Sequence, residues 1–281
     1  MKLGEEGIVM DKVVIIGVFD FVNFHVCKSL LDKGILVRGV QLDTKEKEDM
    51  ASEKRLEIGR NANFAEVSLG DIANQSSANE TIVLSVYDLY MRYKEDYLLT
   101  DHLISSIINK NNWENIVILV PSQILKNVID SKAEIVIEDF LKRTILPNKH
   151  SYLLYLPTVF GPWQPETFIF QSSILTELNR GMPFKGLREE TSDALFVDDA
   201  VKAIIEIMEI NQPGKYLLQS GKDNQWDSCA ALLQLSEQDL NKRILEIKDK
   251  DIIKKIVPST VPLSVALTKQ IEHTHRLNAD H

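Results

Sequence analysis

The segment from residue 12 to residue 34 constrains the fold more than any other part of this chain. An apolar run, Val13–Ile16, leads into Gly17, and apolar side chains then recur at helical spacing until Gly34: Phe21, Val22, Val26, Leu30 and Leu31. A buried strand, a tight glycine turn and an amphipathic helix in this order are typical of the first unit of a doubly wound α/β sheet. The sequence therefore predicts a Rossmann-like α/β fold with a mostly parallel sheet.

The turn after this strand departs from the pattern that binds a dinucleotide. Such a turn carries three glycines, of which the second lets the backbone approach the pyrophosphate and the third lets helix pack on strand. Gly17 holds the first position, whereas Asp20 and Asn23 hold the other two. A carboxylate about 4 Å from a phosphate charge costs roughly 4 kcal/mol at an effective dielectric near 20. Because aspartate is also a favoured N-cap residue, Asp20 is open to two interpretations: a helix cap or a lost cofactor.

Composition excludes several classes of protein. With 281 residues and 44% hydrophobic content, the chain can form one large core, or a nucleotide domain with a smaller lobe. Its formal net charge of −9 argues against nucleic-acid and anionic-membrane partners. Two cysteines are too few for a disulfide framework, no apolar run is long enough for a membrane span, and a cytoplasmic location is expected. We expect no metal site, and we interpret His273 and His275 as solvated.

Strand-like and helix-like segments alternate along the chain, as in a parallel sheet covered on both faces. We expect a Rossmann-like nucleotide-binding domain over 1–160. Residues 161–281 would return to the sheet and form a smaller substrate-type lobe. The expected strands after the first are Ile35–Leu42, Phe64–Val67, Thr81–Val86, Asn115–Val120, Tyr152–Leu156 and Lys215–Gln219, and the expected helices include Leu98–Ile108, Lys132–Leu141 and Asp198–Ile210, with a loop-rich stretch over Gly181–Phe196.

Five short motifs occur in an order and at spacings that point to one family. They are the Gly17 turn with Phe21, Gly70-Asp71-Ile72, Leu99-Thr100, Phe160-Gly161-Pro162-Trp163, and Phe196-Val197-Asp198-Asp199-Ala200. On these motifs the chain resembles the NAD-dependent epimerase/dehydratase family of extended short-chain dehydrogenases/reductases, which acts mostly on nucleotide sugars. The likeness runs from Lys12 to about Gly221 and implies the fold more firmly than the activity.

The resemblance implies a site for NAD or NADP, which the altered turn would make weak or absent. The residues implied for the cofactor are Gly17, Phe19, Asp20, Phe21 and Val22 at the first turn, and Asp71 and Ile72 after the third strand. Asp71 would meet the adenine, although Gly-Asp is also an ordinary turn pair. Asp43 is a candidate for a ribose hydroxyl, while the family register favours Gln41. On the substrate side the resemblance implies Phe160 and, in place of the family's arginine, Arg188. Asp198 and Asp199 are expected as helix caps.

The catalytic set of the family is incomplete here. It consists of a Ser or Thr after the fifth strand, then a Tyr and a Lys four residues later on one helix. The Lys lowers the pKa of the Tyr, which exchanges a proton with the substrate. Ser122 and Lys132 fit two positions as vestigial catalytic residues, but Val128 stands where the tyrosine belongs. Tyr90 and Lys94 have the right spacing on the wrong element, and we interpret them as a surface pair.

Two functions remain open from the sequence. The first is an epimerase/dehydratase-like protein with eroded cofactor and catalytic motifs and a non-catalytic binding, scaffold or regulatory role. The second is an active NAD(P)-dependent nucleotide-sugar epimerase, dehydratase or reductase with an unrecognised proton donor. For either, a homodimer is expected through the helices Leu98–Ile108 and Lys132–Leu141. Their apolar residues could form a shared surface: Leu103, Ile104, Ile107, Ile108, Ile135, Ile137 and Leu141.

Overall fold

The structure is a computed structural model of the 281-residue chain. It describes residues 10–42, 48–74, 79–99, 103–110, 112–126, 131–145, 150–178, 188–235 and 251–279.

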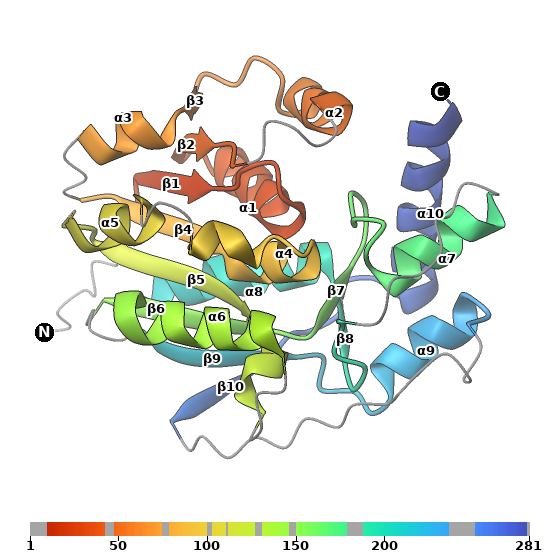
Figure 1. The fold of residues 1–281 in the computed structure, drawn as a ribbon. Coiled ribbons are helices and arrows are strands. Elements are labelled where there is room, and N and C mark those ends of the chain that lie inside the picture. The colour runs from red at the N-terminus through yellow and green to blue at the C-terminus, as the bar shows by residue number, and fades with distance from the viewer. Residues whose placement is uncertain are drawn as a thin grey trace, which may run out of the picture.

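Eight parallel strands form the main sheet, in the spatial order β10-β9-β6-β5-β4-β1-β2-β3 (Figure 1). Every pairing within it is parallel, and the register of β1 on β4 brings Ile16 beside Leu84. This arrangement confirms the predicted Rossmann-like parallel sheet. The strands are β1 (Lys12–Ile16), β2 (Leu36–Val40), β3 (Phe64–Val67), β4 (Thr81–Ser85), β5 (Asn115–Pro121), β6 (Ser151–Leu156), β9 (Gly214–Gln219) and β10 (Ile252–Ile256).

Helices cover both faces of the sheet. In Figure 1, α4 (Val86–Met91), α5 (Leu103–Lys110) and α6 (Lys132–Phe140) lie in front of the strands, whereas α1 (Phe21–Asp32) and α8 (Val197–Ile210) lie behind them. The central strands are therefore buried from both sides, and β5 is buried along its whole length. Such strands read as continuous apolar runs because neither face meets water. Two further helices, α2 (Glu48–Ile58) and α3 (Leu69–Asn74), flank β3 in the sequence.

A smaller group of elements lies beyond one end of the main sheet (Figure 1). It contains a two-stranded parallel sheet of β7 (Thr158–Phe160) and β8 (Ala194–Phe196). Around this pair lie α7 (Ile169–Glu177), α9 (Gln225–Leu232) and α10 (Leu263–Ala279). The same part of the chain contributes β9 and β10 to the main sheet and α8 to one of its faces, so the segment after residue 161 builds both parts.

Two expected elements differ from the structure. The helix expected over Leu98–Ile108 is wrong at its start: a short 3-10 turn, Glu95–Leu98, comes first, and α5 begins at Leu103. Thr100 lies outside the described residues. The loop-rich stretch expected before Asp198 contains β8, whose three residues are all buried. Among the described residues, no helix is long and apolar enough to span a membrane.

The apolar residues invoked for a homodimer face mostly inward. Ile135 remains half exposed and Leu103 partly so, and the other five are buried in the chain's own core: Ile104, Ile107, Ile108, Ile137 and Leu141. A dimer through these helices therefore stays a prediction with little apolar surface to support it.

Candidate nucleotide site

The turn between β1 and α1 requires glycine at position 17, the one glycine of the three-glycine pattern that this sequence has. Gly17 has a φ of +77°, in the left-handed region, and its N–H donates to the Val40 carbonyl at 2.8 Å. A Cβ at this position would lie 2.3 Å from Oδ2 of Asp20. Any larger residue would therefore combine backbone strain with a steric clash.

A carboxylate from another helix caps the amino end of α1. Asp88, on α4, accepts a hydrogen bond from the Val22 N–H at 3.1 Å through Oδ2 and at 3.2 Å through Oδ1. Oδ2 also accepts from the Asn23 N–H at 3.3 Å. The first N–H groups of a helix have no partner within the helix and carry partial positive charge, so they bind anions. Here the chain's own carboxylate is that anion.

Two cations and a second carboxylate complete this cluster. Arg92 forms an ion pair with Asp20, and Lys54 Nζ donates to the Phe19 carbonyl at 2.7 Å. Burial is the main cause that raises the pKa of Asp88, and the charge of Asp20 raises it further. Burial also lowers the pKa of Lys54 to about 8, against the opposing pull of Asp20 and Asp88. The cluster thus brings two carboxylates and two basic side chains to the turn.

Asp20 is a helix cap by position but not by its side chain. Its backbone is extended at the N-cap position, with φ −70° and ψ 164°, and its side chain makes no capping hydrogen bond. The carboxylate turns to Arg92 instead. The side-chain cap considered for Asp20 is therefore wrong, because Asp88 supplies the acceptor.

The other altered glycine position is filled by a buried amide. Asn23 is fully buried, and its Nδ2 donates to the Ile16 carbonyl at 2.8 Å, which ties α1 to the end of β1. Phe21 is also buried, with its ring edge against Phe168. The structure brings together at one turn the first five residues expected at the cofactor: Gly17, Phe19, Asp20, Phe21 and Val22. There the side chains pack against other residues of the chain.

Residues expected near the adenosine lie apart from this cluster. Asp71 is exposed in the first turn of α3, where Oδ2 accepts from Oγ of Ser68 at 2.7 Å and from its N–H at 2.9 Å. Those hydrogen bonds lower the pKa of Asp71. Ile72 is fully buried. Asp71 thus serves its own helix, in the manner of a capping box.

The guanidinium group of an arginine on α2 reaches the end of the second strand. Arg55 Nη2 donates to Gln41 Oε1 at 2.6 Å and to Glu66 Oε1 at 2.7 Å. Its guanidinium carbon lies 4.7 Å from the centroid of the Phe19 ring. Asp43, the other ribose candidate, lies outside the described residues.

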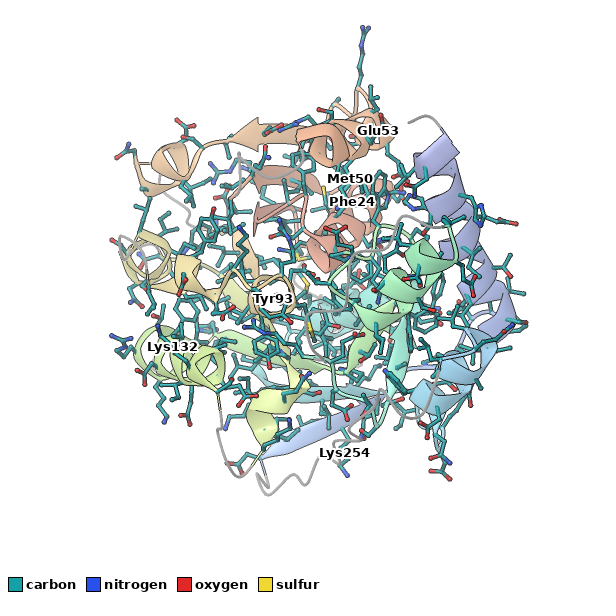
Figure 2. The ribbon with its side chains drawn as sticks, turned by 45° about the vertical axis from the view of Figure 1, so that its right-hand side comes forward. Phe24, Met50, Glu53, Tyr93, Lys132 and Lys254 are labelled. Carbon is teal, nitrogen blue, oxygen red and sulfur yellow. The ribbon has the colours of Figure 1, made fainter. Side chains whose placement is uncertain are left out.

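The expected catalytic residues do not form a proton-transfer pair. Ser122 is buried at the end of β5, and its Oγ has no hydrogen-bond partner among the described residues. Lys132 is exposed and is the first residue of α6, because Ser131 is the N-cap of a capping box with Glu134. Figure 2 shows Lys132 at the outside of the molecule. Val128 lies outside the described residues.

Tyr90 and Lys94, which have the Tyr-x-x-x-Lys spacing, do not form a surface pair, contrary to our interpretation. Tyr90 is buried on α4, and its hydroxyl donates to Glu134 Oε1 at 3.4 Å. Lys94 lies beyond the end of that helix, where its N–H closes onto the Leu89 carbonyl at 2.8 Å. The two side chains therefore do not share a helix face.

Arg188 makes internal contacts instead of standing open to a substrate. Its Nη1 donates to the Tyr90 carbonyl at 2.6 Å and to Glu95 Oε2 at 2.9 Å, and its guanidinium carbon lies 3.7 Å from the Tyr93 ring centroid. The Arg188 carbonyl accepts from Gln123 Nε2 at 2.6 Å, directly after β5. Phe160 is buried in β7, with Phe170 and Phe196 against its ring.

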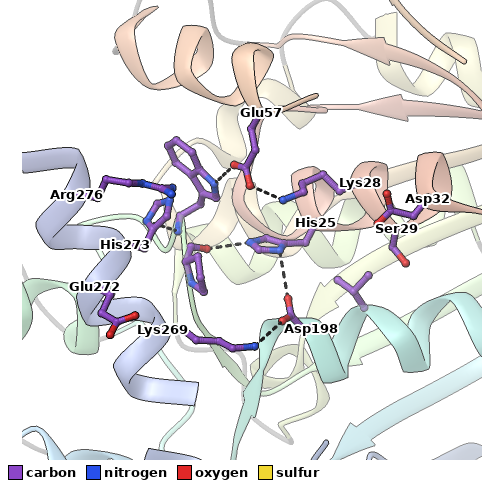
Figure 3. A pocket seen from close by; sticks show the side chains of 13 residues that line it. His25, Lys28, Ser29, Asp32, Glu57, Asp198, Lys269, Glu272, His273 and Arg276 are labelled. Atoms are coloured by element: carbon purple, nitrogen blue, oxygen red, sulfur yellow. Dashed lines mark hydrogen bonds and ion pairs between the residues drawn. The ribbon is translucent and has the colours of Figure 1, made fainter. Parts of the chain in front are cut away.

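A polar cleft of about 720 Å³ lies on another side of α1 (Figure 3). His25 of α1, the Pro162–Trp163 turn, Asp198 of α8 and His273 of α10 contribute to its walls. His273 is nine-tenths buried against Trp163, so its expected solvation is wrong, whereas His275 is exposed. Among the described residues, no group of three or more His, Cys, Asp or Glu side chains is placed to hold a metal ion.

The aspartates that begin α8 also differ from expectation. The N-cap is Phe196, so Asp198 and Asp199 lie in the first helical turn rather than at the cap. Asp199 Oδ1 accepts from the Thr260 N–H at 3.1 Å, which attaches α8 to the segment before α10.

Sequence reasoning missed Asp88, Arg92 and Lys54. Ser85 and Asp88 carry a local signal, because Ser-x-x-Asp at the end of an apolar strand predicts a helix start. Ser85 Oγ indeed accepts from the Asp88 N–H at 3.0 Å. Nothing local shows that the Asp88 carboxylate reaches another helix.

The described residues do not fit a dinucleotide diphosphate at this turn. The N–H groups that would hold it are bonded to Asp88, and Asp20 adds a second negative charge beside them. A diphosphate would have to displace the carboxylate of Asp88 and overcome the charge of Asp20.

Solved structures share this fold at low sequence identity. The UDP-glucuronic acid 4-epimerase of Bacillus cereus, in complex with UDP-glucuronic acid and NAD, superposes with a TM-score of 0.64 at 14% identity, over 95% of this chain and 99% of that one. The UDP-glucose 4-epimerase of Thermotoga maritima, with UDP-glucose, gives 0.60 at 16% over 95% and 99%. The dTDP-glucose 4,6-dehydratase of Bacillus anthracis, in complex with NAD, gives 0.61 at 12% over 95% and 97%.

No family model and no curated protein matches the sequence. The chain therefore has the Rossmann-like fold of the nucleotide-sugar epimerases and dehydratases, as its motifs predicted, and this likeness defines the fold alone.

Proposed function

We propose that this protein is a non-catalytic relative of the nucleotide-sugar epimerases and dehydratases, with a binding, scaffold or regulatory role that does not use a dinucleotide. The single observation that carries the proposal is the bond of Asp88 to the Val22 and Asn23 N–H groups. The Asp88 carboxylate occupies the N–H groups that a phosphate would use, and Asp20 adds a second negative charge beside them. NAD or NADP then binds weakly or not at all.

The substrate side supports the same proposal. Arg188 is bonded to Glu95, and the carbonyls of Arg188 and Glu190 accept from Gln123 and Thr158. The segment that follows residue 187 is thus attached to Gln123, in the turn after β5, and to Thr158, the first residue of β7, on the side where a family substrate would meet the cofactor. A nucleotide-sugar ligand would have to replace these contacts.

The surroundings of Tyr87, Tyr90 and Lys132 support the loss of catalysis. Tyr87 is fully buried, its hydroxyl accepts from the Val159 N–H at 2.9 Å, and burial raises its pKa well above the usual value. Tyr90 is bonded to Glu134, and Lys132 begins a helix on the surface. General acid–base groups contribute about 10²–10⁴-fold to such reactions.

A turnover assay tests this proposal. The full chain is incubated with NAD or NADP and a panel of UDP-, GDP- and dTDP-sugars, and products are followed by mass spectrometry. We expect no turnover, and no difference between the wild type and Lys132→Ala. Robust turnover that Lys132→Ala abolishes would contradict the proposal and favour an active enzyme with another proton donor.

We also propose the cytoplasm as the location and a homodimer as the assembly state. The first rests on composition, and the second now rests on Leu103 and Ile135 alone.

A further inference from the structure

The polar cleft beside α1 holds two hydrogen-bond acceptors that face each other without a hydrogen between them. His25 Nε2 lies 2.9 Å from the Pro162 carbonyl, which can only accept, so Nε2 carries the ring hydrogen. In the neutral ring Nδ1 is then a bare acceptor. It lies 3.7 Å from Asp198 Oδ1, the contact that a dashed line marks in Figure 3. Among the described residues, Nδ1 makes no hydrogen bond.

His25 is fixed in this orientation and kept neutral by its surroundings. The side chain is nine-tenths buried between α1 and the Pro162 turn, with the Phe21 and Phe24 rings 5.8 and 5.9 Å away. Burial is the main cause that lowers its pKa to about 4, helped by the charges of Lys28 and Lys54 and opposed by Pro162 and Glu57. At neutral pH the ring therefore offers no proton to Asp198.

The other charged groups of the cleft carry both signs, and Lys54 acts on both histidines from outside the lining. Lys28 is paired with Glu57, and Lys269 lies 3.9 Å from Asp198. Asp32, Glu272 and Arg276 have no ion pair among the residues that the structure describes. The lining thus holds four carboxylates, Asp32, Glu57, Asp198 and Glu272, against three cations, Lys28, Lys269 and Arg276. The second histidine is also neutral, because burial above all lowers the pKa of His273 to about 4.

We propose that this cleft binds a small organic cation through a primary ammonium group, which donates to both His25 Nδ1 and Asp198 Oδ1. Two acceptors 3.7 Å apart can share one nitrogen that carries several N–H donors. The carboxylate charge of Asp198 at this pair favours a cation over a neutral hydroxyl compound. A metal ion is disfavoured because the described residues offer only two ligands here. The proposal does not depend on the state of the dinucleotide turn.

Ethylammonium and tetramethylammonium separate this proposal from simple charge attraction. Both carry one positive charge, but only ethylammonium has N–H donors. The full chain is titrated with each chloride salt at constant ionic strength, and binding is followed in long-range ¹H–¹⁵N spectra of the histidine rings. The ceiling on binding energy per non-hydrogen atom limits a three-atom ligand to about millimolar affinity, so titration must extend above that.

We expect ethylammonium to saturate and to shift His25 Nδ1 from the position of a bare ring nitrogen, whereas tetramethylammonium leaves it unchanged. Asp198→Asn should weaken ethylammonium at least about tenfold, because it removes a charged acceptor. Asp223→Asn, which removes an exposed carboxylate outside the cleft, should have no effect. His25→Gln, whose Nε2 can keep the donor to Pro162, assigns the resonance and should also weaken binding.

Three results would overturn the proposal: equal affinity for the two salts, ethylammonium binding that Asp198→Asn leaves intact, or no saturable binding at all. So would a His25 Nδ1 resonance of protonated type at pH 7, because the ring would then donate to Asp198 itself. Since the side chain of Asp198 is half exposed, we expect its replacement to leave the fold intact.

Discussion

The Asp88 carboxylate accepts a hydrogen bond from the Val22 N–H at 3.1 Å, across 66 residues of sequence. This contact joins α4, which directly follows β4, to the amino end of α1. The strand β1 leads into α1 and is a parallel neighbour of β4, so the two strands end at the same edge of the sheet. An anion site that the fold creates is thereby filled from within.

Replacing Asp88 should reveal how much this internal cap stabilises the fold. Asp88→Ala leaves the buried Val22 and Asn23 N–H groups without an acceptor, whereas Asp88→Asn retains one carbonyl oxygen. We therefore expect the alanine variant to be about 1–3 kcal/mol less stable than the asparagine variant. Urea unfolding of the two variants measures this difference. Equal stability would mean that the bond to α1 contributes nothing.

The turn glycine should be far less replaceable than a helical one. Gly17→Ala forces an L residue to φ +77° and sets a Cβ 2.3 Å from Asp20, so we expect a loss of more than about 1 kcal/mol. Gly70→Ala, on α3, places its Cβ 3.6 Å from Ser68 Oγ and should be neutral or stabilising. Thermal unfolding compares them, and similar losses would refute the special role of position 17.

Glu189 should make the stability of the wild type fall as pH rises. Burial raises its pKa to about 8, while the Ile169 N–H, a 2.6 Å donor, acts in the opposite direction. Between the ordinary carboxyl pKa near 4.5 and 8, the folded state holds a proton that the unfolded state has lost. The free energy of unfolding then decreases with pH by up to about 1.4 kcal/mol per unit.

Glu189→Gln should make the fall less steep between pH 5 and pH 8, because the amide does not titrate, while Asp88, whose pKa burial also raises, keeps part of the dependence. Glu177→Gln, at the exposed end of α7, is the matched control and should keep the wild-type slope. Denaturation at several pH values gives both slopes. Parallel profiles for the wild type and Glu189→Gln would show that Glu189 ionises normally.

Light scattering tests the expected homodimer. At high micromolar concentration we expect twice the 32.0 kDa chain mass, and Ile135→Glu should reduce it to one chain mass by placing a charge in the remaining apolar patch. A monomeric wild type would remove the dimer from consideration.

The fold could be read from the sequence because its signals are local. Phe64–Val67 is a strand with the predicted ends, and the β1–α1 unit follows from one apolar run, one glycine and helical spacing. The site could not be read in the same way. Asp71 holds the sequence position that the resemblance assigns to an adenine contact, but its side chain bonds to Ser68, three residues away. Asp88 acts on a helix 66 residues earlier, so only the folded chain brings the two together.

Calorimetric titration of the purified chain with NAD tests the loss of the dinucleotide site most directly. We predict at most weak binding by the wild type, about two to three orders of magnitude below low-micromolar affinity, from the repulsion of roughly 4 kcal/mol at this turn. The double variant Asp20→Gly with Asp88→Ala should bind more tightly, because it removes both carboxylates, leaves the Val22 and Asn23 N–H groups without an acceptor and releases Arg92 from its ion pair with Asp20. Low-micromolar binding by the wild type, or NAD retained through purification, would contradict an internally filled site.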